Sequence, residues 1–102
     1  MRRAAKVDAN QPEITGALRR IGASVQPIHT VGKGCPDLLV GYLGLNIVLE
    51  LKDSEKPKSK QNLTEDELEW HREWKGQVAI VNSPEVAVAY VENAVRNMDV
   101  TP

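Results

Sequence analysis

The sequence predicts a single-domain α/β sandwich in which helices pack on a mixed sheet, with the element order α-β-β-β-α-β-α. Three observations lead to this prediction. The chain has 102 residues, which suits one small domain with one core. Stretches with apolar residues at helical spacing alternate with short β-branched runs such as 78–81. Two of the apolar runs are joined by a short glycine-containing stretch, as in a β-hairpin.

Composition narrows the class of protein. The chain lacks Phe and has only two Trp and two Tyr, so Val, Leu, Ile and Ala must form most of the core. A net charge of −1 counts against strong non-specific DNA binding but permits a local basic surface. The single cysteine, Cys35, excludes an internal disulfide and is expected to be a small buried residue. With no membrane-length apolar run and no signal-like N-terminus, a soluble cytoplasmic protein is expected.

The chain divides into a short basic arm at 1–9, a domain at 10–97 and a tail at 98–102. Asn10 and Glu13 match a capping-box pattern around a proline, so the first helix is predicted to begin there. It should end at Gly22, and Gln11 is expected to be a solvated residue of its first turn.

An edge strand is predicted at 24–29, because the proline at position 27 cannot donate to a neighbouring strand. The polar, lysine-rich stretch 53–62 is predicted to be a loop. A capping box at Thr64 and Glu67 then starts a second long helix. A strand at 77–82 and a last helix beginning at Ser83-Pro84-Glu85 complete the domain.

The hairpin is the most informative part of the chain. Strands are predicted at 36–40 and 45–52, joined by a turn at 41–44. Folded in this way, the hairpin brings Asp37 opposite Glu50. Side chains alternate between the faces of a strand, so Glu50 and Lys52 share one face.

Asp37, Glu50 and Lys52 therefore place two carboxylates and an ammonium at one end of an apolar hairpin. Such groups are costly to bury unless they are paired or bind a metal. Two carboxylates suit a hard divalent cation, and a lysine beside them could act on a water or a phosphate. The competing interpretation is a cluster of surface salt bridges on an exposed hairpin face.

These residues resemble the PD-(D/E)xK nuclease superfamily, whose fold is the restriction-endonuclease-like sandwich. The chain is more narrowly similar to the VRR-NUC branch, which includes small stand-alone proteins of phages and bacteria. The resemblance covers roughly residues 10–95 and rests on Gly34-x-Pro36-Asp37, Glu50-x-Lys52, and Leu63-Thr64-x-x-Glu67 leading to Trp70-His71.

The resemblance implies a metal-dependent DNA endonuclease that hydrolyses phosphodiester bonds. It implies that Asp37, Glu50 and the backbone carbonyl of Leu51 bind Mg²⁺, for which Mn²⁺ is expected to substitute. Lys52 would orient or activate the attacking water. Glu13 matches an acidic residue that the superfamily often adds to its site, although a capping partner for the first helix needs no catalytic role.

Glu67 stands where the family usually has Gln, and it is either a supporting site residue or only a helix cap. His71 is expected to pack or to face solvent. Several basic residues are candidates to contact DNA phosphates, against the simpler view that they are solvated: Lys33, Lys56, Lys58, Lys60, Arg2 and Arg3.

Stand-alone members of the family are associated with homodimers that cut branched DNA such as four-way junctions. One small domain has little surface for a large substrate, so a homodimer with two-fold symmetry suits a symmetric junction. The nearest enzymatic alternative is a nickase or restriction-like enzyme of the wider superfamily. Two alternatives of other classes remain: a catalytically inactive DNA-binding module with the nuclease fold, and an adaptor that binds a protein partner. An adaptor would require an exposed apolar patch, for which the helix bearing Trp70 and Trp74 is the candidate.

Overall fold

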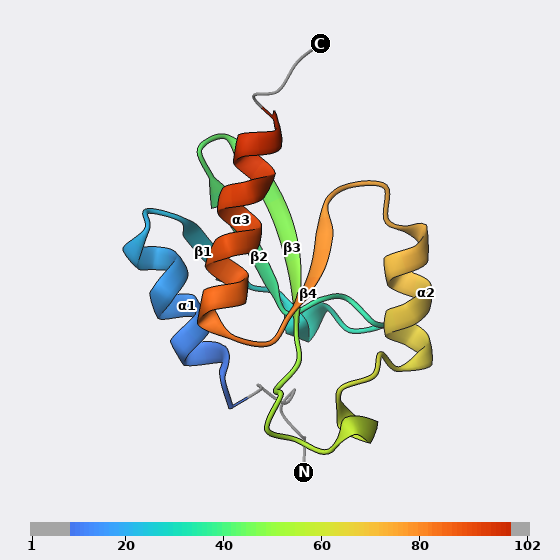
Figure 1. The fold of residues 1–102 in the computed structure, drawn as a ribbon. Coiled ribbons are helices and arrows are strands. Elements are labelled where there is room, and N and C mark those ends of the chain that lie inside the picture. The colour runs from blue at the N-terminus through green and yellow to red at the C-terminus, as the bar shows by residue number, and fades with distance from the viewer. Residues whose placement is uncertain (1–8, 99–102) are drawn as a thin grey trace.

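The structure, a computed structural model, describes residues 9–98 (Figure 1). In chain order its main elements are α1 (Gln11–Arg20), β1 (Ser24–Pro27), β2 (Leu38–Tyr42), β3 (Leu45–Leu51), α2 (Glu65–Glu73), β4 (Val78–Val81) and α3 (Pro84–Met98). Two 3-10 helices, η1 (His29–Val31) and η2 (Lys58–Lys60), lie in the connections. The α/β class and the single domain agree with the prediction. Within residues 9–98, none of the helices has the length and apolar character needed to cross a membrane.

The four strands form one mixed sheet in the order β1-β2-β3-β4. β1 pairs with β2 and β2 with β3 in antiparallel fashion, whereas β3 and β4 are parallel. The predicted edge position of the first strand is confirmed, but the strand ends at Pro27 and the chain turns into η1. The parallel pair requires a long crossover, which η2 and α2 supply.

The hairpin between β2 and β3 turns on two residues, Leu43 and Gly44, with φ of 49° and 87°. Positive φ at both central residues is typical of the two-residue turn that matches strand twist. The turn is shorter than the predicted 41–44, because the first two of these residues pair with β3. The ladder ends with the pair Leu38 and Leu49. Asp37 and Glu50 follow this pair directly, and their carboxyl groups lie close enough to interact.

The core lies on one face of the sheet, against α1 and α3 (Figure 1). Alternation places Leu49 and Leu51 in this core and turns Glu50 to the opposite face. The core consists of aliphatic side chains from the sheet and the two helices: Ile14, Leu18, Leu38, Val40, Ile47, Leu49, Leu51, Val81, Ala87 and Val91. α2 lies apart from the other helices, on the far side of β4, and none of its residues is fully buried. On the face that bears Glu50, α2 brings His71 to within 3.5 Å of the Glu50 carboxyl, while Ile80 on the same face is 49% exposed.

The helix ends differ in how well the sequence predicted them. The capping box of α2 is present, with Thr64 Oγ1 accepting from the Glu67 N–H and the Glu67 carboxylate accepting from the Thr64 N–H. The capping box predicted for α1 is wrong. The Asn10 side chain makes no cap bond and instead donates from Nδ2 to the carbonyls of Lys52 and Asn82, both at 3.3 Å. These carbonyls lie just beyond the ends of the parallel strands β3 and β4, where the ladder supplies no donor.

Candidate active site

Asp37 is held at the start of β2 by three hydrogen bonds. Its N–H donates to the carbonyl of Leu49 at 3.0 Å, and its carbonyl accepts from the N–H of Ile28 at 2.8 Å. Its carboxylate oxygen Oδ2 accepts from the N–H of Leu51 at 2.7 Å. Asp37 is only 9% exposed, so its carboxylate has a defined direction at the point where β2 and β3 separate.

Glu50 is the most deeply buried acidic residue of the site, at 3% exposure. Burial raises the pKa of its carboxyl to about 9, and the charges of Asp37 and Glu67 act in the same direction while Lys52 opposes them. Two adjacent buried carboxylates resist being ionised together unless a cation compensates them. The arrangement is therefore unfavourable for stability alone and suited to holding a positive charge.

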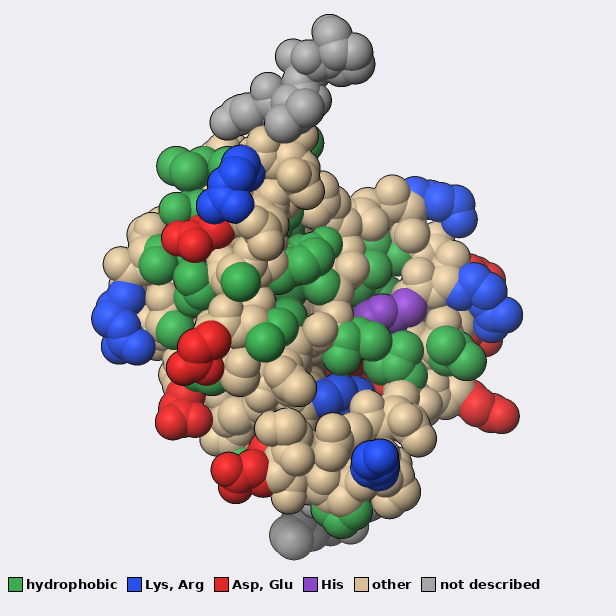
Figure 2. Space-filling view, in the orientation of Figure 1, with side chains coloured by type: hydrophobic (Ala, Val, Ile, Leu, Met, Phe, Trp, Pro, Cys, Tyr) green, Lys and Arg blue, Asp and Glu red, His purple; other side chains and the backbone are tan. Residues whose placement is uncertain are grey.

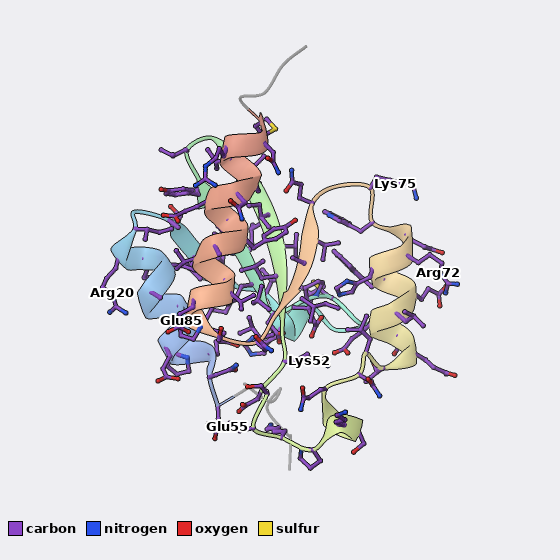
Figure 3. The ribbon with its side chains drawn as sticks, in the orientation of Figure 1. Arg20, Lys52, Glu55, Arg72, Lys75 and Glu85 are labelled. Atoms are coloured by element: carbon purple, nitrogen blue, oxygen red, sulfur yellow. The ribbon has the colours of Figure 1, made fainter. Side chains whose placement is uncertain are left out.

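Lys52 follows Glu50 on the same face of the chain, and its side chain reaches α2. Its Nζ lies 3.0 Å from Glu67 Oε1, with both side chains largely shielded from solvent. Figure 3 shows Lys52 at the foot of β3, between the sheet and the loop that leads to α2. The ammonium is thus held near the two carboxylates rather than extended into solvent.

The carboxylate of Glu67 makes two hydrogen bonds. The same Oε1 atom accepts from the backbone N–H of Thr64 and from the Lys52 ammonium, each at 3.0 Å. Burial alone would raise the pKa of Glu67, but the Thr64 N–H and Lys52 outweigh burial and lower it. Glu67 therefore stays ionised, and the helix cap and the lysine are joined through one carboxylate.

His71 is a site residue that the sequence interpretation missed. It was expected to pack or face solvent, yet its Nε2 lies 3.5 Å from Glu50 Oε1, and only 13% of its side chain is exposed. Burial lowers the pKa of His71, with Glu67 raising it and Lys52 lowering it further. One signal was available: His71 is four residues after Glu67, so both lie on the same face of α2.

A glycine contact holds α2 against the start of β2. Gly34 has φ of +83°, and a Cβ at this position would lie 2.2 Å from the carbonyl oxygen of Asp66 in the first turn of α2. Only glycine permits this approach. The Gly34 loop thus fixes where α2 begins, and with it the position of Glu67 beside Lys52.

Cys35 lies within electrostatic reach of the site. Burial raises the pKa of its thiol, and the charges of Glu50 and Asp37 raise it further. A thiol with a raised pKa remains protonated and is a poor nucleophile. Cys35 was expected to be a buried residue, but it is only partly buried, in the loop that leads to β2.

Glu13 lies elsewhere. It is exposed in the first turn of α1 and lines a polar hollow of about 320 Å³ with Asp53 and Glu55, among other residues. Asp37 and Glu50 do not line this hollow. The neighbouring Gln11, expected to be solvated, is instead 7% exposed, and its Oε1 has no hydrogen-bond partner among the described residues. That expectation is wrong, since the turn of α1 directs Gln11 inward.

The candidate DNA-binding residues are dispersed. Lys33 is exposed between Gly32 and Gly34 with φ of 56°, beside the loop that enters β2. Lys56 and Lys58 are exposed in the segment after β3, and Lys60 belongs to η2. Arg2 and Arg3 lie outside the described residues. On the face drawn in Figure 2, the Lys and Arg side chains are scattered rather than gathered in one patch.

The donor set fits a hard divalent cation. Asp37 and Glu50 contribute carboxylate oxygens, the donors that Mg²⁺ prefers. In a strand, the N–H and C=O of one residue point to the same side, and the Leu51 N–H points to Asp37. The Leu51 carbonyl therefore faces the side on which Asp37 lies.

Comparison of this chain with protein-family models, with curated proteins and with solved structures gave no match.

Proposed function

We propose that this protein is a metal-dependent DNA endonuclease of the PD-(D/E)xK superfamily, of the VRR-NUC type, with a restriction-endonuclease-like fold. One observation carries the proposal: Asp37 and Lys52 both lie close enough to Glu50 to act on its carboxyl, at the point where Glu67 and His71 of α2 meet β3. A surface salt-bridge cluster is a poorer explanation. Surface salt bridges form between exposed side chains, whereas Asp37 and Glu50 are only 9% and 3% exposed.

Mg²⁺ would be held by Asp37, Glu50 and the carbonyl of Leu51, with Mn²⁺ as a substitute. A bound divalent cation lowers the pKa of a coordinated water and neutralises charge on the phosphate in the transition state. The tight hydrogen bond from Leu51 to Asp37 keeps the first carboxylate in a fixed direction. Burial keeps bulk water away from the second carboxylate, that of Glu50.

Lys52 would donate a hydrogen bond and positive charge to the attacking water or to the phosphate. Its held position supports this role, since Glu67 restrains an ammonium that otherwise has many rotamers. Glu67 is then a supporting residue. The location of Glu13 favours a different role for that residue, outside the metal site.

We further propose that the substrate is branched DNA such as a four-way junction and that the protein acts as a homodimer. The resemblance and the small size of the domain support this view. We propose Lys33, Lys56 and Lys58, which are exposed, as contacts to DNA phosphates. Lys60, Arg2 and Arg3 remain candidates from the sequence alone.

A second candidate function has one observation in its favour. Leu68, Trp74 and Ile80 are each about half exposed, on α2 and β4. Figure 2 shows hydrophobic side chains gathered in this region, between α2 and the rest of the domain. Such a patch suits an adaptor for a protein partner, or an inactive nuclease-fold DNA-binding module.

The deciding experiment is cleavage of a labelled four-way junction, a duplex and a single strand, each with Mg²⁺, Mn²⁺ or chelator. Lys52→Ala is compared with Lys75→Ala, which removes an exposed lysine beyond the other end of α2 (Figure 3). We expect metal-dependent cutting that Lys52→Ala abolishes and Lys75→Ala retains, with junction binding kept by both. Folded wild-type protein that cuts no substrate with either metal would contradict the nuclease function and favour the second candidate.

A further inference from the structure

Two polar residues of α2 contact Glu50 of β3 and Lys52, the residue that follows this strand. Glu67 contacts Lys52 at 3.0 Å, and His71 contacts Glu50 at 3.5 Å. Two residues along a strand span about 6.6 Å, and four residues along a helix span about 6 Å. The spacings agree, so one docking position of α2 makes both contacts.

The Glu50–His71 contact restrains a carboxylate that has considerable freedom of its own. Glutamate has three side-chain torsions, and β3 fixes only where the side chain begins. Protonated Glu50 can donate a hydrogen bond to Asp37 or Glu67, but once it is ionised both residues repel it and its carboxylate needs another donor. His71, from the opposite element, offers a ring nitrogen next to Oε1 in a largely buried setting.

We infer that His71 is a positioning residue for Glu50, an inference that rests on the proposed metal-dependent function. A hydrogen on Nε2 of the imidazole donates to Glu50 Oε1 when the carboxylate is ionised, because an ionised carboxylate only accepts. This bond selects one orientation of the Glu50 side chain beside Asp37. Partners that orient metal-binding residues in this way commonly affect affinity by ~10–100-fold.

The alternative for His71 is a packing role. Its ring lies edge-on to Trp70, with ring centroids 6.0 Å apart and an interplanar angle of 70°. Packing requires only the volume of the ring, whereas positioning requires a donor at the place of Nε2. Substitution can separate the two. The amide nitrogen of Gln is as many bonds from Cα as Nε2 of His, whereas that of Asn is closer and falls short.

The test compares His71→Gln with His71→Asn, both polar and compatible with a helix. The first readout is the affinity of the metal-free protein for Mn²⁺, by titration calorimetry, and the second is kcat and KM on the junction substrate. We expect His71→Asn to weaken Mn²⁺ binding by ~10-fold or more and to lower kcat with little change in KM. In His71→Gln, the Mn²⁺ affinity and kcat should both stay within about threefold of the wild-type values, well below the ~10–100-fold loss expected when a positioning partner is removed.

Three outcomes would overturn the inference. Equal losses in both variants would mean that the ring itself is needed, as packing requires. Unchanged Mn²⁺ affinity in both would mean that His71 does not act on the metal-binding carboxylate. Wild-type protein that neither binds Mn²⁺ nor cuts DNA would remove the proposed function and the inference with it. In the first two cases the wild-type protein is still active, so the proposed function survives. Thermal unfolding of each variant shows whether the fold is retained.

Discussion

The carboxylate of Asp37 accepts a 2.7 Å hydrogen bond from the backbone N–H of Leu51, the residue between Glu50 and Lys52. The bond lies just beyond the last ladder pair, Leu38 and Leu49, where the Asp37 N–H still donates to the Leu49 carbonyl. It makes one acidic side chain part of the sheet as well as of the proposed metal site. Different substitutions of Asp37 can therefore separate its role in stability from its proposed role in metal binding.

For Asp37 we expect Asn and Ala to differ in stability but not in activity. Asn retains an oxygen that can accept from Leu51, whereas Ala leaves a buried N–H without a partner, at a cost of about 1–3 kcal/mol. Both remove the negative charge and should abolish metal-dependent cleavage. Urea denaturation and junction cleavage are the measurements. Cleavage by the Asn variant at the wild-type rate would contradict the role assigned to Asp37.

The raised pKa of Glu50 predicts an unusual dependence of stability on pH. Between its ordinary value of 4.5 and the folded value of about 9, the native protein holds a proton at Glu50 that the unfolded chain has lost. The contribution of Glu50 to stability is therefore largest below pH 4.5 and declines as the pH rises toward 9. Without metal at pH 8, Glu50→Gln should be more stable than wild type by about 1–3 kcal/mol.

The Glu50 prediction is checked by urea denaturation of both proteins at pH 5 and pH 8, with and without Mn²⁺. The advantage of Glu50→Gln should shrink at pH 5, and Mn²⁺ should stabilise only the wild type. A difference between the two proteins that does not change with pH would show that Glu50 is not the titrating group.

Glu67 should tolerate Gln but not Ala. Gln can accept from the Thr64 N–H and from Lys52, so the helix cap and the lysine position should persist with cleavage largely retained. Ala removes both bonds but keeps the bond from the residue 67 N–H to Thr64 Oγ1. A typical lost hydrogen bond costs about 0.5–1.5 kcal/mol. We expect Glu67→Ala to lower the unfolding free energy and to reduce kcat. Equal kcat for Gln and Ala variants would argue that Lys52 needs no partner on α2.

We expect substitution of Gly34 to be more damaging than substitution of Gly32, because only Gly34 lies against another backbone segment. Both have positive φ, but a Cβ at Gly34 would collide with the Asp66 carbonyl, whereas a Cβ at Gly32 would meet open space. Backbone strain of about 1–3 kcal/mol is expected for Gly32→Ala. Gly34→Ala should cost more and should also lower cleavage, because it displaces the start of α2. Chemical denaturation and DNA cleavage are measured for Gly32→Ala and Gly34→Ala. Backbone strain should lower stability in both variants, whereas only the collision with the Asp66 carbonyl should also lower cleavage.

Much of the site was predictable because the signals are local. The two-residue period of β3 and the glycine at the hairpin turn are enough to set the register, and with it the closeness of Asp37 to Glu50. The capping box at Thr64 likewise depends on only four adjacent residues. The failed cap at Asn10 shows the limit of such signals. Its amide has better partners on two strand ends that are distant in sequence.

By itself, the sequence determined the α/β class, the hairpin register and the convergence of Asp37, Glu50 and Lys52, since alternation and turn chemistry act over a few residues. Only the tertiary structure decided which groups face them. The crossover could place α2 in several ways, and the contact between Gly34 and Asp66 selects the one that brings Glu67 to Lys52 and His71 to Glu50. That contact joins residues far apart in the chain, so no local pattern encodes it.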